Sequence, residues 1–441
     1  MFRKMNLRNG QSLWEEAKKI IPTGNQLLSK RAERFLPGLW PSYYKKAKGC
    51  EVWDISGKHF YDFAQMGVGS CVLGYANEEV NAAVIESINN GSMASLNSYE
   101  EVQLAEKLIS LHPWSDMARF ARTGGEACAI GVRIARAASG KDKVAFCGYH
   151  GWHDWYLSSN IGDTSNLDEQ LLPGLKPRGV PRNLKYSSFP FFYNDIDSLK
   201  KIVEENSDIG VIIMEPQRNE NPKKNFLHQV KQIANKIGAV LIFDEVTSGF
   251  RMNNGGIHLT YNIEPDIAIF GKALGNGFPI SAIIGRRNVM EAAQSSFISS
   301  TFWTERIGYT AALKTLEIFK RDNVNISLFK YGKMINNIWM QAAKEADLDI
   351  HISGIPQLTH LSFKNIFPME SQTFYTQEML KRGYLLGASV YPTYSYTESI
   401  IDEFGRHTTE VFQLLSKYLK NGSIIHKLEC PVIETGFKRL N

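Results

Sequence analysis

Short apolar runs alternate with amphipathic segments between about residues 100 and 300. Five of these runs have the length and near-continuous apolar character of buried strands: 117–121, 143–147, 211–214, 240–243 and 267–270. Segments with helical spacing of apolar residues separate them. Strands that are apolar on both faces and joined by helices predict a mainly parallel sheet with helices on both sides. We therefore expect an α/β fold with this sheet in a large domain.

The two ends of the chain follow a different pattern. Ser12, with a glutamate three residues later, predicts a helix capped by that serine and ended by Pro22. Residues 51–54 and 59–63 resemble strands, and the Ser-Gly between them predicts a hairpin turn. A long amphipathic helix is predicted to begin after Gly308, and a mixed region follows it. We expect a large domain over residues 60–310, and a smaller α+β domain formed by an N-terminal arm and the C-terminal segment (1–59 and 311–441).

Composition narrows the class of protein. The chain has 441 residues, of which 43% are apolar and 22% charged, as in an ordinary globular enzyme of more than one domain. The net charge of +5 is a mild excess, and the basic patches are scattered Lys/Arg pairs rather than a long block, so we expect no nucleic-acid partner. No apolar stretch approaches a membrane span, and the first residues lack the apolar core of a signal peptide. Five cysteines without a CxxC pair indicate reduced thiols in a cytoplasmic protein.

A lysine and an acid stand at the ends of two predicted strands. Lys272 comes just after the run 267–270, on a loop that contains Gly275 and Gly277, and Asp244 ends the run 240–243. A lysine at such a position is rarely buried unless it pairs or reacts, and its amine suits a Schiff base with an aldehyde cofactor. A carboxylate on the adjacent strand would hold a pyridine nitrogen protonated. Together these are the two polar contacts that pyridoxal phosphate needs.

In this order and 28 residues apart, Asp244 and Lys272 resemble the active site of the class III pyridoxal-phosphate aminotransferases. The branch that contains glutamate-1-semialdehyde aminomutase is the nearest resemblance, from about Leu13 to about Asp402. This resemblance implies a fold-type I transferase, pyridoxal 5'-phosphate as cofactor and a homodimer. Lys272 would form the Schiff base and also move the proton, while Asp244 would pair with the ring nitrogen.

The phosphate site is predicted at the start of a helix. Thr123, Gly124 and Gly125 follow the run 117–121 and precede a segment with helical spacing. Backbone N–H groups at a helix start favour an anion, and two glycines let the backbone approach it. Where the family usually has Ser-Gly-Thr, this chain has Thr-Gly-Gly. Arg122 before it replaces the usual small polar residue.

Tyr149 and His150 follow the strand that ends at Cys147. The resemblance places Tyr149 on one face of the cofactor ring and Val246 on the other, and His150 joins the cofactor-binding residues. His150 and His153 lack a third ligand at suitable spacing, so we predict no metal site.

Glu215 follows the strand 211–214, where the family has a Glu-Pro turn beside the phenolic oxygen of the ring. The next residues depart from the family. We expect Gln217 or Glu220 near the cofactor or substrate, and Arg218 is a candidate for binding an anionic substrate. A simple Arg218–Glu220 pair on a loop is an equal alternative.

Thr301 matches the family threonine that reaches the phosphate of the neighbouring subunit, which implies a shared active site in the dimer. The usual Ser-Gly-Asn-Pro continuation is replaced by Trp303-Thr304-Glu305-Arg306.

Further candidate substrate residues lie toward the two ends of the region that resembles the family. Arg31 lies where the aminomutase branch has an arginine for the substrate carboxylate, with Arg34 as a competitor. The C-terminal glutamate of that branch is missing. Tyr391, Tyr394 and Tyr396 occupy this region instead, either lining the pocket for a different substrate or packing half-buried.

We therefore predict an aminotransferase that moves an amino group from an amino donor to a carbonyl acceptor through pyridoxamine phosphate. The alternative is an intramolecular 1,2-aminomutase of the glutamate-1-semialdehyde type, which the missing glutamate and the altered Thr301 loop disfavour. A third alternative is a cofactor-binding protein without catalysis. It is disfavoured because Asp244, Lys272, Tyr149 and Thr301 are all present.

Overall fold

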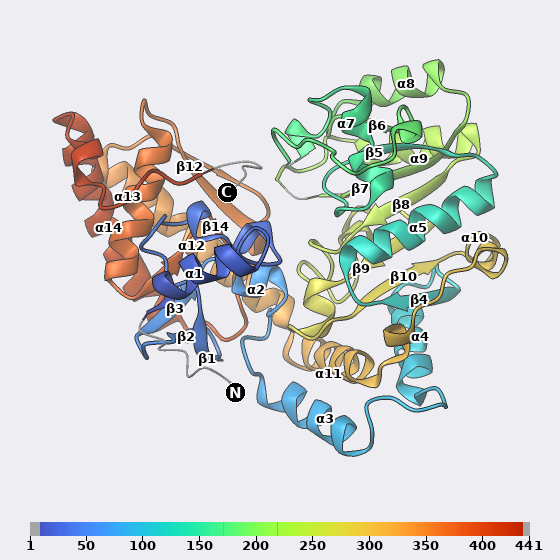
Figure 1. Cartoon of the computed structure of the whole chain (residues 1–441), viewed down its shortest axis with the longest axis horizontal. Coiled ribbons are helices and arrows are strands. Elements are labelled where there is room, and N and C mark those ends of the chain that lie inside the picture. Colours follow the sequence, from blue (N-terminus) through green and yellow to red (C-terminus); the bar gives the residue numbers. More distant parts are fainter. Residues whose placement is uncertain (1–8, 171, 218, 435–441) are drawn as a thin grey trace. The chain divides into compact units, whose positions relative to one another are not determined.

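The computed structural model of the chain describes residues 9–170, 172–217 and 219–434. The chain forms two compact units, each described here by itself (Figure 1). The larger unit comprises Glu78–Ile326. The smaller unit combines the segment up to Asn77 with the segment that begins at Ser327.

A seven-stranded sheet forms the centre of the larger unit, in the order β4-β10-β9-β8-β7-β5-β6. Its strands are β4 (Met117–Ala121), β5 (Lys143–Cys147), β6 (Ser188–Pro190), β7 (Ile209–Met214), β8 (Val240–Asp244), β9 (Ile267–Phe270) and β10 (Ser281–Gly285). Neighbours from β6 to β9 are parallel, whereas β10 is antiparallel to both β9 and β4. The mainly parallel sheet and the five predicted strands are confirmed, while β6 and β10 were not predicted.

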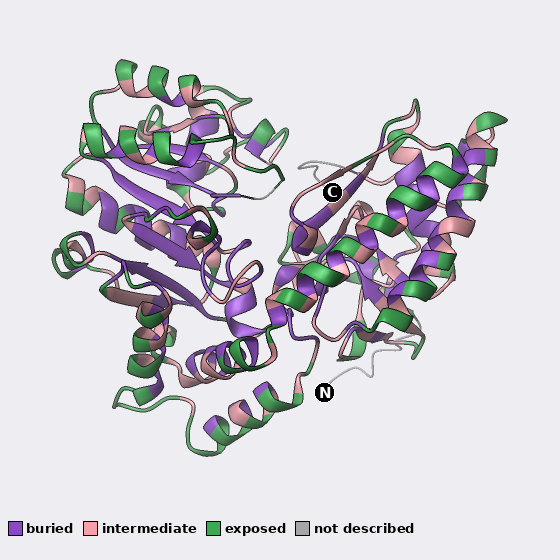
Figure 2. Ribbon diagram, turned by 180° about the vertical axis from the view of Figure 1, so that it is seen from behind, coloured by how far each residue is buried: buried purple, intermediate pink, exposed green. Residues whose placement is uncertain are grey.

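Successive residues along the strands pack on opposite faces of this sheet. Ile242 and Ile269 belong to a core cluster shared with α5, and Leu241 and Phe243 belong to a second cluster shared with α9. Figure 2 shows the strands buried between these layers. Because both faces are covered by helices, the strand sequences are continuously apolar.

The helices of this unit are α3 (Glu78–Asn89), α4 (Tyr99–Leu111), α5 (Gly124–Ser139), α6 (Asp154–Leu157), α7 (Ser159–Gly162), α8 (Ile196–Glu205), α9 (Phe226–Ile237), α10 (Arg287–Met290) and α11 (Arg306–Asp322). The smaller unit contains α1 (Gly10–Ile20), α2 (Met66–Gly69), α13 (Pro368–Lys381) and α14 (Glu398–Lys420), and α12 (Val324–Ala346) begins at the boundary between the units. No helix in the described ranges is both long enough and apolar enough to span a membrane.

Two sheets organise the smaller unit, in the orders β1-β2-β3-β13 and β11-β12-β14. Their strands are β1 (Tyr44–Lys48), β2 (Glu51–Asp54), β3 (His59–Phe63), β11 (Ile350–Ser353), β12 (Thr359–Phe363), β13 (Tyr384–Leu386) and β14 (Ser389–Val390). β2 and β3 form the predicted hairpin, and β3 pairs in parallel with β13 from the C-terminal segment.

The unit boundaries lie after Asn77 and Ile326, whereas the sequence placed them near residues 60 and 310. The pairing of β3 with β13 assigns β3 to the smaller unit, and the packing of α11 against α3 and α4 keeps the whole of α11 in the larger unit. Both contacts join segments distant in sequence.

Two helix starts differ from the prediction. α1 begins at Gly10, and Asn9 rather than Ser12 is its cap, since the Asn9 side chain accepts a hydrogen bond from the Ser12 N–H at 2.8 Å. α11 begins at Arg306, before Gly308, because the Glu305 carboxylate accepts the Ile307 N–H at 2.6 Å. In each case a carboxylate or amide a few residues upstream satisfies the first backbone donors.

Candidate active site at the carboxyl ends of the strands

The parallel strands β5, β7, β8 and β9 end at the same edge of the sheet. Cys147 pairs with Met214, and Asp244 pairs with Ile269. The segments that carry Tyr149, Glu215 and Lys272 therefore begin side by side, which is where ligands bind in parallel α/β sheets. The sheet brings together these predicted site residues from positions up to 123 apart in sequence.

Asp244 is buried and its two oxygens accept hydrogen bonds from three protein groups. Oδ1 accepts the backbone N–H of Val246 at 3.0 Å, and Oδ2 faces Nδ1 of His150 at 2.8 Å. The thiol of Cys128 on α5 donates to Oδ2 at 3.3 Å. Burial acts to raise the pKa of Asp244, but the hydrogen bonds and charge of His150, together with the Val246 N–H, outweigh it and lower that pKa. The carboxylate is therefore ionised, as the predicted role requires.

His150 lies between Asp244 and the end of β5. Its Nδ1 faces the Asp244 carboxylate, and its Nε2 faces the carbonyl oxygen of Cys147 at 3.2 Å. Both neighbours are acceptors, so the two hydrogen bonds form together only when both ring nitrogens carry a proton. The sequence predicted His150 beside the cofactor, and its observed contact is with the carboxylate.

Cys128, His150 and Asp244 also have potential metal-ligand atoms within 4.8 Å of one another. The thiol and the imidazole instead donate hydrogen bonds to the carboxylate, and these bonds account for the arrangement of all three groups.

Lys272 occupies the first position of a short 3-10 turn after β9, with a left-handed backbone (φ 41°). This conformation costs a residue with a side chain about 1 kcal/mol. Its amine donates to the Thr247 hydroxyl at 2.8 Å, three residues beyond Asp244. The amine is therefore held at the same strand end as the carboxylate.

The Thr123–Glu126 segment begins α5 as a capping box. The Thr123 hydroxyl accepts the Glu126 N–H at 3.4 Å, and Glu126 Oε2 accepts the Thr123 N–H at 2.8 Å. A Cβ on Gly124 would lie 2.8 Å from Val246 Cγ1, so this backbone approaches the Asp244 strand end too closely for any other residue. The predicted phosphate loop thus lies against the predicted ring site.

Tyr149 and Glu215 meet at the ends of β5 and β7. The Glu215 carboxylate accepts the Tyr149 N–H at 3.2 Å, and the Tyr149 side chain is exposed by 37%. Gly148 has a φ of 109°, and a Cβ there would lie 2.7 Å from the Glu215 carboxylate. Glycine is therefore required between the strand and Tyr149.

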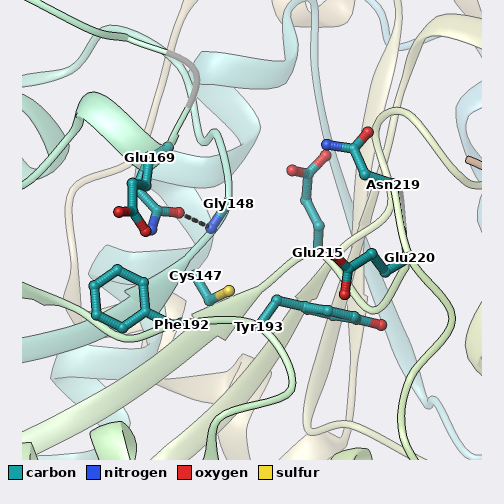
Figure 3. Close-up of a pocket in the computed structure, with 9 residues that line it drawn as sticks. Cys147, Gly148, Glu169, Phe192, Tyr193, Glu215, Asn219 and Glu220 are labelled. Carbon is teal, nitrogen blue, oxygen red and sulfur yellow. Dashed lines mark hydrogen bonds between the residues drawn. The ribbon is translucent and has the colours of Figure 1, made fainter. Parts of the chain in front are cut away.

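A cavity of about 290 Å³ opens beside Glu215. Figure 3 shows Glu169 on one side of it and Glu215, Asn219 and Glu220 on the other, with Phe192 and Tyr193 below. Gln217 is buried, and its amide donates to Asn221 at 2.6 Å and accepts the Tyr261 hydroxyl, so it anchors the loop. Arg218 lies outside the described residues.

The candidate substrate residues Arg31 and Tyr391 belong to the smaller unit. Arg31 is buried, and burial lowers its guanidinium pKa more than nearby Glu33 and Glu434 raise it. Tyr391 is also buried, with its N–H bonded to Ala64. Tyr396 belongs to the core, where its ring stacks on Phe63 at 4.7 Å.

Thr301 begins a short 3-10 turn, Thr301–Thr304, and is exposed. The residues that replace the family sequence after Thr301 all form hydrogen bonds or ion pairs. Arg306 forms an ion pair with buried Glu100 at 2.7 Å, and the Trp303 indole faces Glu126 at 3.4 Å.

Three features of this region were not predicted from the sequence. One is the contact of Cys128 with Asp244, and another is the contact of Thr247 with Lys272. Thr247 could have been suspected from its position three residues after Asp244, whereas Cys128 only faces the carboxylate once α5 packs on the sheet. The third is a buried network around Glu245, whose carboxylate contacts His258 Nδ1 at 2.5 Å. No local motif indicates that network.

These residues fit pyridoxal phosphate. An ionised buried carboxylate suits a pyridinium nitrogen, an amine at the adjacent strand end suits the aldehyde, and the start of α5 suits the phosphate. The close approach of Gly124 to Val246 joins the ring and phosphate ends of that site.

Comparison with known proteins gives the family. The aminotransferase class-III family model matches residues 38–385. A 3-aminobutyryl-CoA aminotransferase from Cloacimonas acidaminovorans is 34% identical over 390 residues, covering 86% of this chain and 90% of the relative. A glutamate-1-semialdehyde 2,1-aminomutase from Methanothrix thermoacetophila is 33% identical over 438 residues, covering 94% and 97%.

Solved structures agree on the fold. The pyridoxal-phosphate internal aldimine form of the FumI protein from Sphingopyxis sp. MTA144 has a TM-score of 0.85 at 23% identity, covering 96% of this chain and 99% of that chain. A glutamate-1-semialdehyde aminomutase from Pseudomonas aeruginosa PAO1 has a TM-score of 0.78 at 17% identity, covering 92% and 94%. The architecture is thus that of fold-type I transaminases. With the family model matching most of its length, the chain belongs to the class III aminotransferases, and its cofactor is pyridoxal phosphate.

Proposed function

We propose that this protein is an aminotransferase that moves an amino group from an amino donor to a carbonyl acceptor in two half-reactions. The observation that carries the proposal is that Lys272 and the ionised carboxylate of Asp244 lie at the ends of the adjacent strands β9 and β8, where the Lys272 amine donates to Thr247. Bound pyridoxal phosphate supplies the aldehyde that holds the amino group between the two halves and the ring that takes up electron density.

Each residue has a distinct part in this proposal. Asp244 holds the proton on the ring nitrogen, and His150 and Cys128 keep that carboxylate ionised and oriented. Lys272 moves the substrate proton, and the Thr247 hydroxyl orients its free amine.

Binding of the cofactor involves the surrounding loops. Tyr149 and Val246 would hold the ring from its two faces, and Glu215 would lie on the side of its phenolic oxygen. The start of α5, at Thr123, Gly124 and Gly125, takes the phosphate. Since the Thr123 hydroxyl is engaged in the capping box, the backbone N–H groups and the helix dipole supply most of this binding.

For substrate binding we propose the residues that the sequence indicated. Arg31 would bind a carboxylate, and Gln217, Arg218 and Tyr391 would surround the rest of the substrate. The observed hydrogen bonds of Gln217 favour an indirect part for this residue, as a support for the Glu215–Glu220 loop.

We also propose a homodimer in which Thr301 reaches the phosphate of the partner subunit. The class III aminotransferases take amino and keto substrates and are commonly dimeric, and Thr301 is exposed at a turn. Free thiols at all five cysteines favour the cytoplasm.

An intramolecular aminomutase is the second candidate, because relatives of both kinds have about one third identity to this chain. The absence of the C-terminal glutamate and the replacement of Ser-Gly-Asn-Pro after Thr301 favour the aminotransferase.

A spectral titration with and without 2-oxoglutarate tests the proposal. Amines such as glutamate, alanine, 4-aminobutyrate and amino sugars are added to the protein loaded with cofactor, with Lys272→Ala as the control. We expect one amine to convert the Lys272-dependent visible band to the pyridoxamine form, and a keto acid to reverse it. Turnover of an amino-aldehyde without any keto acid would identify an aminomutase. The absence of a lysine-dependent band would contradict both.

A further inference from the structure

Arg122 lies one residue before the glycine loop, and its side chain is directed away from that loop. Its guanidinium donates to the carbonyl oxygens of Phe302 at 2.6 Å, of Trp303 at 3.2 Å and of Pro279 at 3.4 Å. It also donates to the carbonyl of Glu305. Four acceptors on one guanidinium use its fixed fork of donors, which a lysine lacks.

A second link runs in the opposite direction. The Trp303 indole N–H faces Glu126 Oε1 at 3.4 Å, while Glu126 Oε2 accepts the backbone N–H groups of Arg122 and Thr123 at 3.2 and 2.8 Å. Each of the two segments therefore inserts one side chain into the other. This reciprocal connection joins the capping box of α5 to the turn that begins at Thr301.

The surroundings of the guanidinium are shaped to receive it. A Cβ on Gly308 would lie 2.3 Å from Arg122 Nη1, so glycine is needed at this position on α11. The Tyr309 ring lies 5.2 Å from the guanidinium carbon, and the Tyr309 hydroxyl donates to the Trp303 carbonyl. Gly308 and Tyr309 thus form a specific packing site for the Arg122 guanidinium.

We propose that Arg122 is a positioning residue that joins the glycine loop, Thr123–Gly125, to the segment Thr301–Glu305. The contact fixes both segments, so that the glycine loop meets the phosphate of its own subunit and Thr301 meets the phosphate of the partner subunit. The inference rests on the proposed function of these two segments. The two departures from the family, at Arg122 and after Thr301, are then explained together, because they form the two sides of one contact.

Three variants break this contact in different ways. Arg122→Ala removes it, and Arg122→Lys keeps the positive charge but loses the multiple hydrogen bonds. Gly308→Ala keeps Arg122 and displaces its guanidinium. Arg136→Ala is the matched control, since that arginine lies near the opposite end of α5 and also donates to a backbone carbonyl, that of Asp142.

The first measurement compares the dissociation constants of pyridoxal phosphate and pyridoxal for each folded variant. All three variants are expected to weaken pyridoxal phosphate binding by about tenfold or more, as for loss of a charged hydrogen-bond contact. Pyridoxal, which has no phosphate, is expected to change less than about twofold on the same scale. Equal losses of affinity for pyridoxal phosphate and for pyridoxal would overturn the proposal. Full affinity of Arg122→Lys for pyridoxal phosphate would overturn it as well.

The second measurement needs no cofactor. Hydrogen exchange at the amides of residues 301–305 is expected to be at least about tenfold faster in Arg122→Ala and Gly308→Ala than in the wild type, and unchanged in Arg136→Ala. Unchanged exchange in the first two variants would overturn the proposal. Failure of the wild type to form a Lys272-dependent band would instead reject the proposed function, and the exchange result would still decide the role of Arg122.

Discussion

Two neighbouring residues, Asp244 and Glu245, both bury a carboxylate against a histidine, yet they serve different parts of the larger unit. Asp244 points to the α5 side of the sheet and contacts His150 and Cys128. Glu245 contacts His258 on the opposite side, where Phe243 also packs. The alternation of side chains at a strand end separates them.

Their partners differ in kind. The Glu245 oxygens accept the backbone N–H groups of Ile257 and His258, at 2.5 and 3.1 Å, besides the His258 ring. These bonds close the loop that follows β8. Asp244 accepts one backbone bond, and its other partners are side chains on the segments that form the proposed cofactor site. Burial alone therefore does not identify a catalytic carboxylate, whereas the elements that supply its partners do.

The largest effect is expected for Asp244→Asn. The amide keeps the shape of the carboxylate but loses the charge that holds the ring nitrogen protonated. The rate of the amino-donor half-reaction is expected to fall by at least about a thousandfold. Single-turnover absorbance kinetics measure it. A fall of less than about tenfold on that scale would contradict the assigned role of Asp244.

Glu245→Gln is the converse test and the matched control for Asp244→Asn. The amide presents an NH₂ group to buried donors, so the free energy of unfolding is expected to fall by about 4 kcal/mol. The half-reaction rate of the folded protein is expected to change little. Urea denaturation and single-turnover kinetics on the same sample separate the two. If Glu245→Gln instead slowed the half-reaction strongly and left the free energy of unfolding unchanged, Glu245 would have a catalytic rather than a structural role.

The network behind Glu245 also predicts a pH dependence of stability. Burial lowers the pKa of His112 from 6.5 to about 4, and its Nε2 accepts the Gly256 N–H at 2.9 Å. Between these pH values the unfolded chain binds a proton that the folded chain does not. The free energy of unfolding is therefore expected to fall by about 1.4 kcal/mol for each pH unit as the pH is lowered from 6.5 to 4.

His112→Gln has no titrating ring, so its unfolding free energy is expected to depend less steeply on pH in this window. Urea denaturation at pH 4.5, 5.5 and 6.5 measures the slopes. Equal slopes in the variant and the wild type would exclude His112 as the source.

The smallest effect is expected for Cys128→Ala, which removes one weak donor from Asp244. The loss is about 1 kcal/mol or less, and corresponds to a change of at most about fivefold in the half-reaction rate. The pKa of the Lys272-dependent band, measured by absorbance titration, is expected to shift as well. Cys128→Ser retains a donor and is expected to restore both values. Identical behaviour of the two variants would assign the effect to packing.

The sequence predicted the features that depend on local pattern. Apolar runs located β5, β7, β8 and β9, and the residues after these runs gave Asp244, Glu215 and Lys272. The exceptions were β6, which has three residues and ends in proline, and β10, which has only two larger apolar residues, Ile283 and Ile284. Periodicity is too weak over such lengths to distinguish a strand from a loop.

Features that depend on tertiary packing were not predictable in the same way. The Glu245 network joins His112, Trp114 and His258 across 146 residues of sequence, and Trp114 donates to His258 Nε2 at 2.9 Å. Arg122 was recognised as a departure from the family, but its acceptors lie 157 to 183 residues away. Hydrogen-bond partners at such separations follow from the fold rather than from spacing.

The parallel pairing of β3 with β13 has a consequence for biosynthesis. A ribosome completes β3 long before it reaches Tyr384, and at about 5–20 residues per second the interval is roughly 15–65 s. During that interval the larger unit, which is continuous in sequence, can be completed and fold. The edge of β3 lacks its partner meanwhile, and an unpaired edge is a template for association with other chains. The nascent N-terminal hairpin thus stays open to association with other chains until the C-terminal segment has emerged.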